Sequence, residues 1–278
     1  MTGGFVATDL GRLYVRRTGT GPPVVLWHSL FFDSTSWGPI IDSLARHRTV
    51  LAIDGPSHGA SEAATRDFSV PECAAIAIQA LDQLDLTDPV DWVGNAWGGH
   101  VGIQLAMGAR PRVRTLTTIG TPVRGFSAWE KLVKGFPLLV WLYQAVGPVG
   151  VVTKPVSDSL LGAEAVAAQP DRCAAIVDSF RRADRTGMAR AIRSLLLRRT
   201  DVTELLPDVS VPTLVLSARD DTIGWRPAEA EQTCAAIPDC RVHAVAGGGH
   251  VAPLVLDADR IVTLIEEFWR TAASPCRP

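Results

Sequence analysis

The sequence has few features that point to a membrane, a secretory route or nucleic acid. No apolar run within its 278 residues reaches about 18 residues without a charge or a Gly/Pro break, which is the length that a membrane-spanning helix needs. The start, Met1–Phe5, lacks a basic segment followed by an apolar one, so we expect no secretory signal and a cytoplasmic protein. The net charge of -2 predicts neither nucleic acid nor a membrane surface as a partner.

Motifs for metals and cofactors are absent as well. The five cysteines are scattered, with no Cys-x-x-Cys pair and no histidine at zinc-ligand spacing, so we expect reduced thiols and no metal. Neither Gly-x-Gly-x-x-Gly nor Gly-Lys-Ser/Thr occurs, which argues against phosphate binding by a glycine-rich loop. We therefore expect no cofactor.

What the sequence does contain is an alternation of short apolar runs and amphipathic segments. Continuous apolar runs predict buried strands, and apolar stripes at helical spacing predict helices between them. Strands linked by helices in this way form a mostly parallel sheet flanked by helices. The predicted strands are 13–18, 23–28, 50–53, 90–93, 113–119, 212–217 and 242–245, and the predicted helices are 37–46, 71–84, 100–107, 227–237 and 257–270.

The alternation stops between residues 121 and 207. Segments 127–146, 163–182 and 186–199 look helical with no strand between them, which predicts an inserted helical lid over a core made of residues 1–120 and 208–278. The last two segments are rich in arginine, Arg199 included. We expect these arginines on a solvated helix face, with an acid-binding patch as the alternative.

One turn carries the strongest chemical signal. Residues 94–99, Gly-Asn-Ala-Trp-Gly-Gly, follow a predicted strand and open a predicted helix. This is the layout of a nucleophile elbow, in which Gly-x-Ser-x-Gly exposes a serine hydroxyl above the sheet. Here the central residue is Ala96, whose methyl group cannot attack a carbonyl.

Four other loops follow predicted strands at residues 26–30, 54–61, 217–220 and 249–250. With the elbow they make the chain resemble the α/β-hydrolase family over nearly its whole length apart from the lid. The resemblance implies the α/β-hydrolase fold and a triad in which Asp220 orients His250 toward the nucleophile position, Ala96. It also implies that the backbone amides of Leu30 and Trp97 form an oxyanion hole.

Some of these assignments have rivals. Asp221 could replace Asp220 as the acid, and His243 competes with His250, although His243 lies inside a predicted strand. His28 belongs to a loop that normally shapes the site in this family, as does His58, so either could touch a ligand. Ser29 stands where the family usually has glycine, and serine resists the positive φ that glycine permits.

The residues expected to line the cleft are apolar and mostly aromatic, which suits a hydrophobic small-molecule substrate. They are His28, Phe31, Phe32, Trp129, Phe136, Trp141 and Trp225, together with Trp97.

We therefore expect a carboxylic ester or lactone hydrolase with a Ser-His-Asp triad, present here in a form that lacks its nucleophile and is inactive or nearly so. We favour an introduced serine-to-alanine substitution, since the rest of the triad is intact. One alternative is a carbon-carbon bond hydrolase of ring-cleavage products, whose elbows similarly carry asparagine at the position of Asn95. Another is a natural non-catalytic ligand-binding protein on the same fold.

Overall fold

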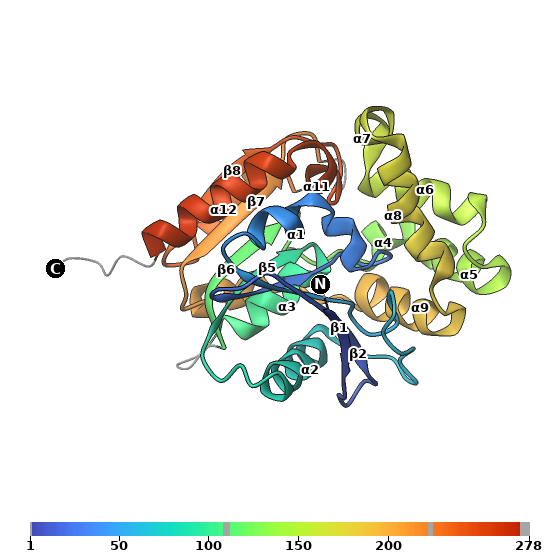
Figure 1. The fold of residues 1–278 in the computed structure, drawn as a ribbon. Helices are drawn as coiled ribbons and strands as arrows, with labels where there is room; N and C mark the ends of the chain where they lie inside the picture. The colour runs from blue at the N-terminus through green and yellow to red at the C-terminus, as the bar shows by residue number, and fades with distance from the viewer. Residues whose placement is uncertain (1, 108–111, 222–224, 273–278) are drawn as a thin grey trace.

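The chain folds around one eight-stranded sheet in a computed structural model that describes residues 2–107, 112–221 and 225–272 (Figure 1). The strand order is β1-β2-β4-β3-β5-β6-β7-β8. The strands are β1 (Thr2–Val6), β2 (Leu13–Thr18), β3 (Pro23–Trp27), β4 (Thr49–Ile53), β5 (Val90–Asn95), β6 (Val113–Ile119), β7 (Thr213–Ala218) and β8 (Cys240–Val245).

The predicted mostly parallel sheet is confirmed. Strands β4, β3, β5, β6, β7 and β8 pair in parallel, whereas β1 and β2 pair antiparallel at one edge. Strand β1 was not predicted, because its exposed residues carry no apolar pattern. The carboxyl ends of β3, β4, β5, β6 and β7 lie at one edge of the sheet, which brings the loops that follow them together.

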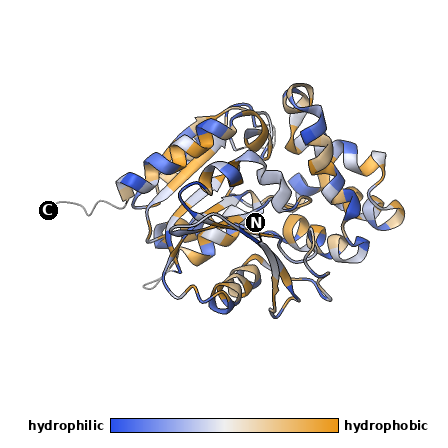
Figure 2. Ribbon diagram, in the orientation of Figure 1, coloured by the Kyte–Doolittle hydropathy of each residue, from blue (hydrophilic) through white to orange (hydrophobic). Residues whose placement is uncertain are grey.

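Helices cover both faces of the sheet (Figure 1). Helix α2 packs on α3, which lies against β5 and β6, while α1 packs on α12. Figure 2 shows apolar residues along the strands and on the inner sides of these helices. The helices of this layer are α1 (Pro39–Leu44), α2 (Val70–Gln83), α3 (Trp97–Leu105), α10 (Pro227–Cys234), α11 (Ala252–Leu256) and α12 (Ala258–Ala272), with a 3-10 turn η1 (Ser34–Trp37).

The segment between β6 and β7, where a helical lid was predicted over residues 121–207, is built of helical elements. Its elements are α4 (Ala128–Val133), α5 (Phe136–Val146), α6 (Gly150–Leu160), α7 (Gly162–Ala168), α8 (Pro170–Arg182), α9 (Arg185–Ile192), the π-helical turn η2 (Arg193–Leu197) and the 3-10 turn η3 (Thr203–Asp208). Two predicted helices are each split, one at Gly135, where φ is 70°, and one before Pro170. Helix α6, which contains Pro155, lies largely outside the predicted helical segments and was not predicted.

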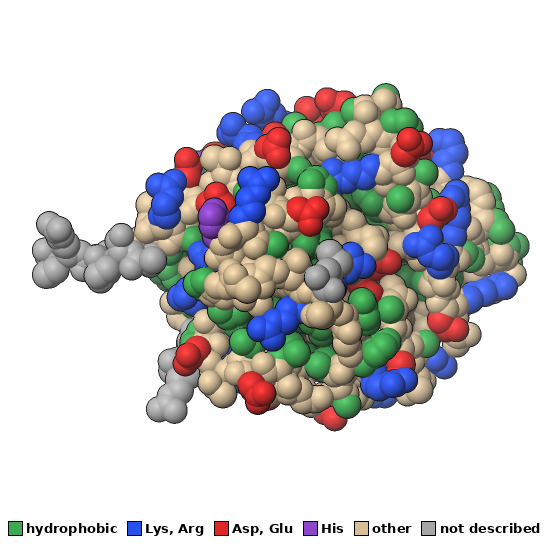
Figure 3. Space-filling model, in the orientation of Figure 1, with side chains coloured by type: hydrophobic (Ala, Val, Ile, Leu, Met, Phe, Trp, Pro, Cys, Tyr) green, Lys and Arg blue, Asp and Glu red, His purple; other side chains and the backbone are tan. Residues whose placement is uncertain are grey.

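Charged side chains are interspersed over the surface, with both signs mixed on the face shown in Figure 3. No helix in the described residues combines the length and the apolar composition that crossing a membrane requires.

A buried carboxylate ties the start of β5 to its neighbours. Asp91 is fully buried, and it accepts hydrogen bonds from Arg48 Nη1 and Thr115 Oγ1, each at 2.7 Å, and from the Arg114 guanidinium. The Arg48 guanidinium also lies over the Trp269 ring, 4.0 Å from its centroid. Asp91 and Arg48 together therefore link β5, β6 and α12 at the end of the sheet opposite the elbow.

Removing that charge destabilises the fold. In Asp91→Asn the arginines keep only an amide oxygen as acceptor, and we expect the free energy of unfolding to fall by about 2 kcal/mol, less than for a fully buried pair because Arg114 is half exposed. The matched control is Asp82→Asn, which breaks the exposed pair with Arg112 and costs about 0.5 kcal/mol or less. Urea denaturation measures both, and equal losses in the two variants would contradict a special role for Asp91.

Candidate active site

The turn between β5 and α3 has the geometry of a nucleophile elbow. Ala96 is held at φ 48° and ψ -103°, and its amide donates to the Ile119 carbonyl at 2.8 Å. The turn is tight enough that a Cβ on Gly94 would lie 2.1 Å from the Gly98 carbonyl carbon, and one on Gly98 would lie 2.0 Å from the Trp27 oxygen. Only glycine fits at both positions. The tight turn that the two glycines permit projects the side chain of the central residue, Ala96.

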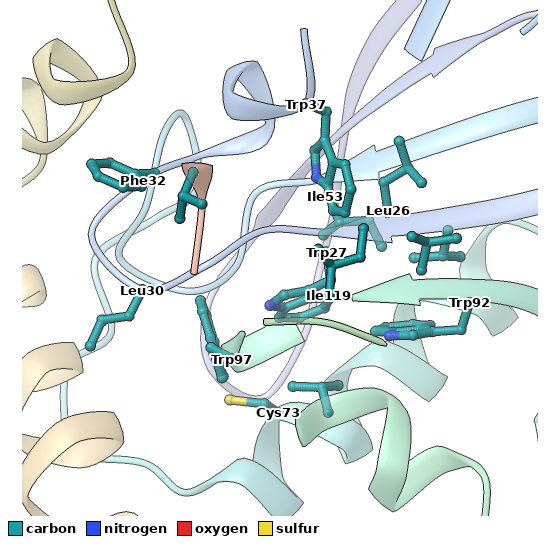
Figure 4. Close-up of a cluster of buried hydrophobic side chains, with 14 of the residues drawn as sticks. Leu26, Trp27, Leu30, Phe32, Trp37, Ile53, Cys73, Trp92, Trp97 and Ile119 are labelled. Carbon is teal, nitrogen blue, oxygen red and sulfur yellow. The ribbon is translucent and has the colours of Figure 1, made fainter. Parts of the chain in front are cut away.

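Two backbone amides beside Ala96 are available to a ligand. The amides of Leu30 and Trp97 donate to no acceptor in the described part of the chain, and both residues line the same cavity as Ala96. The next amide, that of Phe31, is occupied, because it donates to His58 Nε2 at 3.3 Å. Figure 4 shows Leu30 and Trp97 as neighbours, with the indole of Trp97 above Cys73. This arrangement leaves the two amides expected in the oxyanion hole unpaired.

The loop after β3 has serine where the family usually has glycine, and its positive φ falls on a different residue. Serine at position 29 was expected to resist a positive φ, and the residue of this loop that adopts one is Phe31, at 79°. The Phe31 amide bond to His58 and the edge-on packing of the Phe31 ring on Phe180, at 5.1 Å, support this unusual conformation. Serine at position 29 therefore imposes no left-handed strain.

His250 faces the cavity and is paired with a buried carboxylate. Its Nδ1 lies 2.7 Å from Asp221 Oδ2, and the side chains are 8% and 0% exposed. Because the carboxylate holds Nδ1, Nε2 is the nitrogen that remains to exchange a proton with a group in the cavity. Ala96 lines the same cavity.

The partner expected for His250 was Asp220, and the structure brings Asp221 there instead. The amides of Arg219 and Asp220 donate to the carbonyls of Val245 and Gly247, so the pairing with β8 continues past the end of β7. This extension leaves the side chain of Asp220 exposed and turns that of Asp221 inward. The spacing typical of the family had indicated Asp220, one residue before the aspartate that the structure places beside His250.

His28 does not reach the cavity, contrary to expectation. It is fully buried, its Nε2 accepts the Gly55 amide at 2.8 Å, and its Nδ1 lies 2.7 Å from the Ser29 carbonyl oxygen. His58 bridges the Pro56 carbonyl and the Phe31 amide in the same way. Burial lowers the pKa of both imidazoles, so both are neutral and fasten the loops after β3 and β4 to each other.

The cavity has a volume of about 490 Å³ and lies between the strand ends and the helical insertion. Most of its surface is apolar. The lining residues are Ser29, Leu30, Phe31, Val70, Ala96, Trp97, His100, Pro122, Phe126, Lys134, Gly135, Phe136, Leu138, Leu139, Leu142, Val151, Pro155, Val156, Ser159, Leu160, Leu195, Leu196, Arg199 and His250.

Only part of the expected aromatic lining is present. Phe31 and Phe136 do line the cavity. Phe32 and Trp225 are buried in the core and do not line the cavity. Trp129 and Trp141 are 71% and 62% exposed, on the outer sides of α4 and α5. Their helices were predicted, but which sides face outward was not.

Other lining residues were not predicted from the sequence. His100, one turn into α3, lies with Nε2 2.8 Å from the Pro122 carbonyl, and burial above all lowers its pKa to about 3, so it is neutral. Phe126 and Arg199 come from the two ends of the insertion. The aliphatic lining residues of α5 and η2 lie in segments that were predicted to be helical, whereas α6 was not predicted, and nothing in the sequence showed which helix sides face a cavity.

Asn95 is a further residue whose position matters. Its Nδ2 donates to the carbonyls of Ile119, at 2.9 Å, and of His250, at 2.7 Å. The side chain is fully buried and does not line the cavity. It therefore ties the elbow to the loop that carries His250. Within the described ranges, no three His, Cys, Asp or Glu side chains cluster closely enough to hold a metal ion.

Comparison with known proteins agrees with this geometry. A family model described as "Alpha/beta hydrolase family" matches residues 24–264. The pimeloyl-(acyl-carrier protein) methyl ester esterase of Xanthomonas axonopodis pv. citri is 26% identical over 261 residues, covering 92% of this chain and 98% of that one. An esterase from Thermogutta terrifontis, solved with malate bound, is 25% identical with a TM-score of 0.88 and covers 99% of this chain and 100% of its own.

A further solved structure, the enol-lactonase of Burkholderia xenovorans LB400, has a TM-score of 0.86 at 23% identity, covering 96% of this chain and 100% of its own. The likeness at this level of identity concerns the fold. With the family match extending from β3 into α12, the chain belongs to the alpha/beta hydrolase family, as the loops at the strand ends predicted.

Proposed function

We propose that the site is that of a carboxylic ester or lactone hydrolase for a hydrophobic small molecule. The observation that carries the proposal is the convergence on one apolar cavity of the elbow residue Ala96, the His250–Asp221 pair and the unpaired amides of Leu30 and Trp97. The esterase relatives from Xanthomonas and Thermogutta support ester cleavage as the chemistry.

The proposed reaction needs serine at position 96. His250 Nε2 would take the serine proton as the hydroxyl oxygen attacks the ester carbonyl, and the Leu30 and Trp97 amides would donate to the resulting oxyanion. The imidazolium, stabilised by Asp221, would return the proton to the leaving alcohol. Water, deprotonated by His250, would then cleave the acyl-enzyme and regenerate the serine.

With alanine at position 96, the chain is proposed to bind this substrate without turning it over. Nothing else in the acyl-transfer machinery depends on the missing hydroxyl, because the donors are backbone amides and His250 is held by Asp221. We favour an introduced substitution as the origin of Ala96. The alternative, a natural ligand-binding protein, is supported by the same alanine and by an intact apolar cavity.

The helical insertion is proposed to act as the lid of this cavity. Residues from α5, α6 and η2 form one wall, and Leu138 and Val151 are exposed as well as lining, so they mark the mouth. An apolar mouth and an apolar interior favour a substrate with an aliphatic or aryl group. A carbon-carbon bond hydrolase is less favoured, since Asn95 faces the His250 loop rather than the substrate.

Restoring the hydroxyl tests the proposal. Ala96→Ser should raise kcat/KM for hydrophobic p-nitrophenyl or methyl esters by on the order of 10⁴- to 10⁶-fold, the scale on which triad nucleophiles contribute. The control is the double variant Ala96→Ser with His250→Ala, which keeps the serine and removes its base. Release of alcohol is followed at constant pH. No gain on any ester or lactone, or consumption of a dienol ring-cleavage product with esters untouched, would overturn the assignment.

The identity of the acid has its own test in the Ala96→Ser chain. Asp221→Asn should lower kcat by on the order of 10⁴-fold, because the amide favours the wrong imidazole tautomer. Asp220→Asn removes the same charge from the adjacent exposed residue and should change kcat less than about twofold, as surface substitutions do. The reverse ranking of the two variants would return the role to Asp220.

A further inference from the structure

Two cations, Lys134 and Arg199, lie in the wall of the mostly apolar cavity; Lys134 is exposed, whereas Arg199 is half-buried. Arg199 lines the cavity close to His100, and no Asp or Glu side chain within the described ranges comes within 4.0 Å of its guanidinium. Its neighbour Asp201 accepts the amides of Gly125 and Thr203 instead. Burial lowers the pKa of Arg199 to about 10, which leaves it charged at neutral pH.

Backbone contacts fix the orientation of this guanidinium. Nη2 donates to the Arg124 carbonyl at 2.8 Å and Nη1 to the Pro122 carbonyl at 3.3 Å, and the group lies 4.9 Å from the Phe126 ring centroid. Arginine has five N–H donors, so donors remain after these two bonds. The Pro122 carbonyl that it contacts also accepts from His100, which places the guanidinium beside α3 on the elbow side of the cavity.

A buried charge without a counter-ion is costly, and an ion pair or hydrogen bonds must offset that cost. The other arginines of the insertion behave as the sequence predicted: Arg193 and Arg198 both pair with Asp67 outside the cavity. Arg199 differs from them because it lines the cavity and forms no ion pair with an Asp or Glu of the described residues, although the negative charge of Asp201 acts on it and partly opposes the lowering of its pKa. A single planar guanidinium matches a single carboxylate in charge and geometry.

We propose that Arg199 binds a carboxylate carried by the substrate away from the cleaved bond, so that the site selects esters of hydrophobic acids with a free carboxylate, such as half-esters of dicarboxylic acids. This inference rests on the proposed hydrolase function for the bond that is cleaved. It adds a second point of recognition, the half-buried cation Arg199 in a mostly apolar wall.

The chain as it stands permits a direct binding test, because Ala96 leaves a bound ester uncut. Isothermal titration calorimetry compares monomethyl with dimethyl esters of straight-chain dicarboxylic acids, from glutaric to sebacic. For the best-fitting length, the half-ester should bind at least about tenfold more tightly than its neutral dimethyl ester, as expected for charge-assisted hydrogen bonds.

Three variants separate recognition from structure. Arg199→Gln should reduce the ratio of the two Kd values, dimethyl ester over half-ester, from at least about tenfold to about one, and Arg199→Lys, which keeps the charge, should retain part of the preference. Arg198→Gln removes the same charge one residue away, from a side chain that is 62% exposed, and should keep the full preference. Loss of both ligands in both Arg199 variants would assign Arg199 to holding the 122–124 loop and overturn the proposal.

Equal affinity for half-ester and dimethyl ester, or a preference that survives in Arg199→Gln, also overturns it. The outcome is separable from the proposed hydrolase function through the Ala96→Ser chain. Hydrolysis of neutral hydrophobic esters with no effect of a carboxylate sustains the hydrolase and rejects the role of Arg199. If binding depends on the carboxylate but the Ala96→Ser chain hydrolyses no ester, the role of Arg199 is sustained and the hydrolase function is rejected.

Discussion

The site depends on the backbone conformation of Ala96. A non-glycine residue at φ 48° and ψ -103° stores roughly 1–3 kcal/mol of strain, which the surroundings must hold in place. The restraint is the close approach of Gly94 to Gly98 and of Gly98 to the end of β3, together with the Ala96 amide bond to β6. Beneath them the Trp97 indole packs against the rings of Trp27, His28 and His58. The elbow is thus built into the core, and its shape does not rely on a catalytic side chain.

The histidine loop is held from three directions by backbone contacts. Asn95 reaches it from the elbow, Gly120 passes so close that a Cβ there would lie 2.7 Å from the His250 oxygen, and the Val251 amide donates to Leu160 of α6. Arg172 and Gln169 extend the last contact by donating to the carbonyls of Leu254 and Val255. Part of the insertion is therefore fastened to the loop that carries the base. A shift of α6 would move His250 as well as the cavity wall.

How far the sequence predicts this molecule depends on which interactions decide each feature. The parallel strands follow from continuous apolar runs, and the elbow from its glycines, because both signals are local. The sequence predicted Asp220 as the partner of His250, whereas the structure places Asp221 there, because β7 and β8 keep pairing beyond the apolar run, a long-range effect that exposes Asp220 and buries Asp221. The wall of the cavity was only partly predicted. Whether Trp129 and Trp141 face inward or outward depends on how the short helices that carry them pack, and the local sequence does not determine that packing.

The π-helical turn η2 (Arg193–Leu197) makes the side chains that line the cavity depend on the number of residues in the insertion. Such a wide turn contains one residue more than an α-helical path would, and each residue of an α-helix rotates the chain by about 100°. Leu195 and Leu196 in this turn line the cavity, and Arg199 follows it by only two residues. A homologue with one residue fewer here would turn a different side chain toward the ligand while every strand-end loop stayed the same. A single-codon deletion in η2 would therefore change the wall of the cavity with no substitution at Ala96, Asp221 or His250.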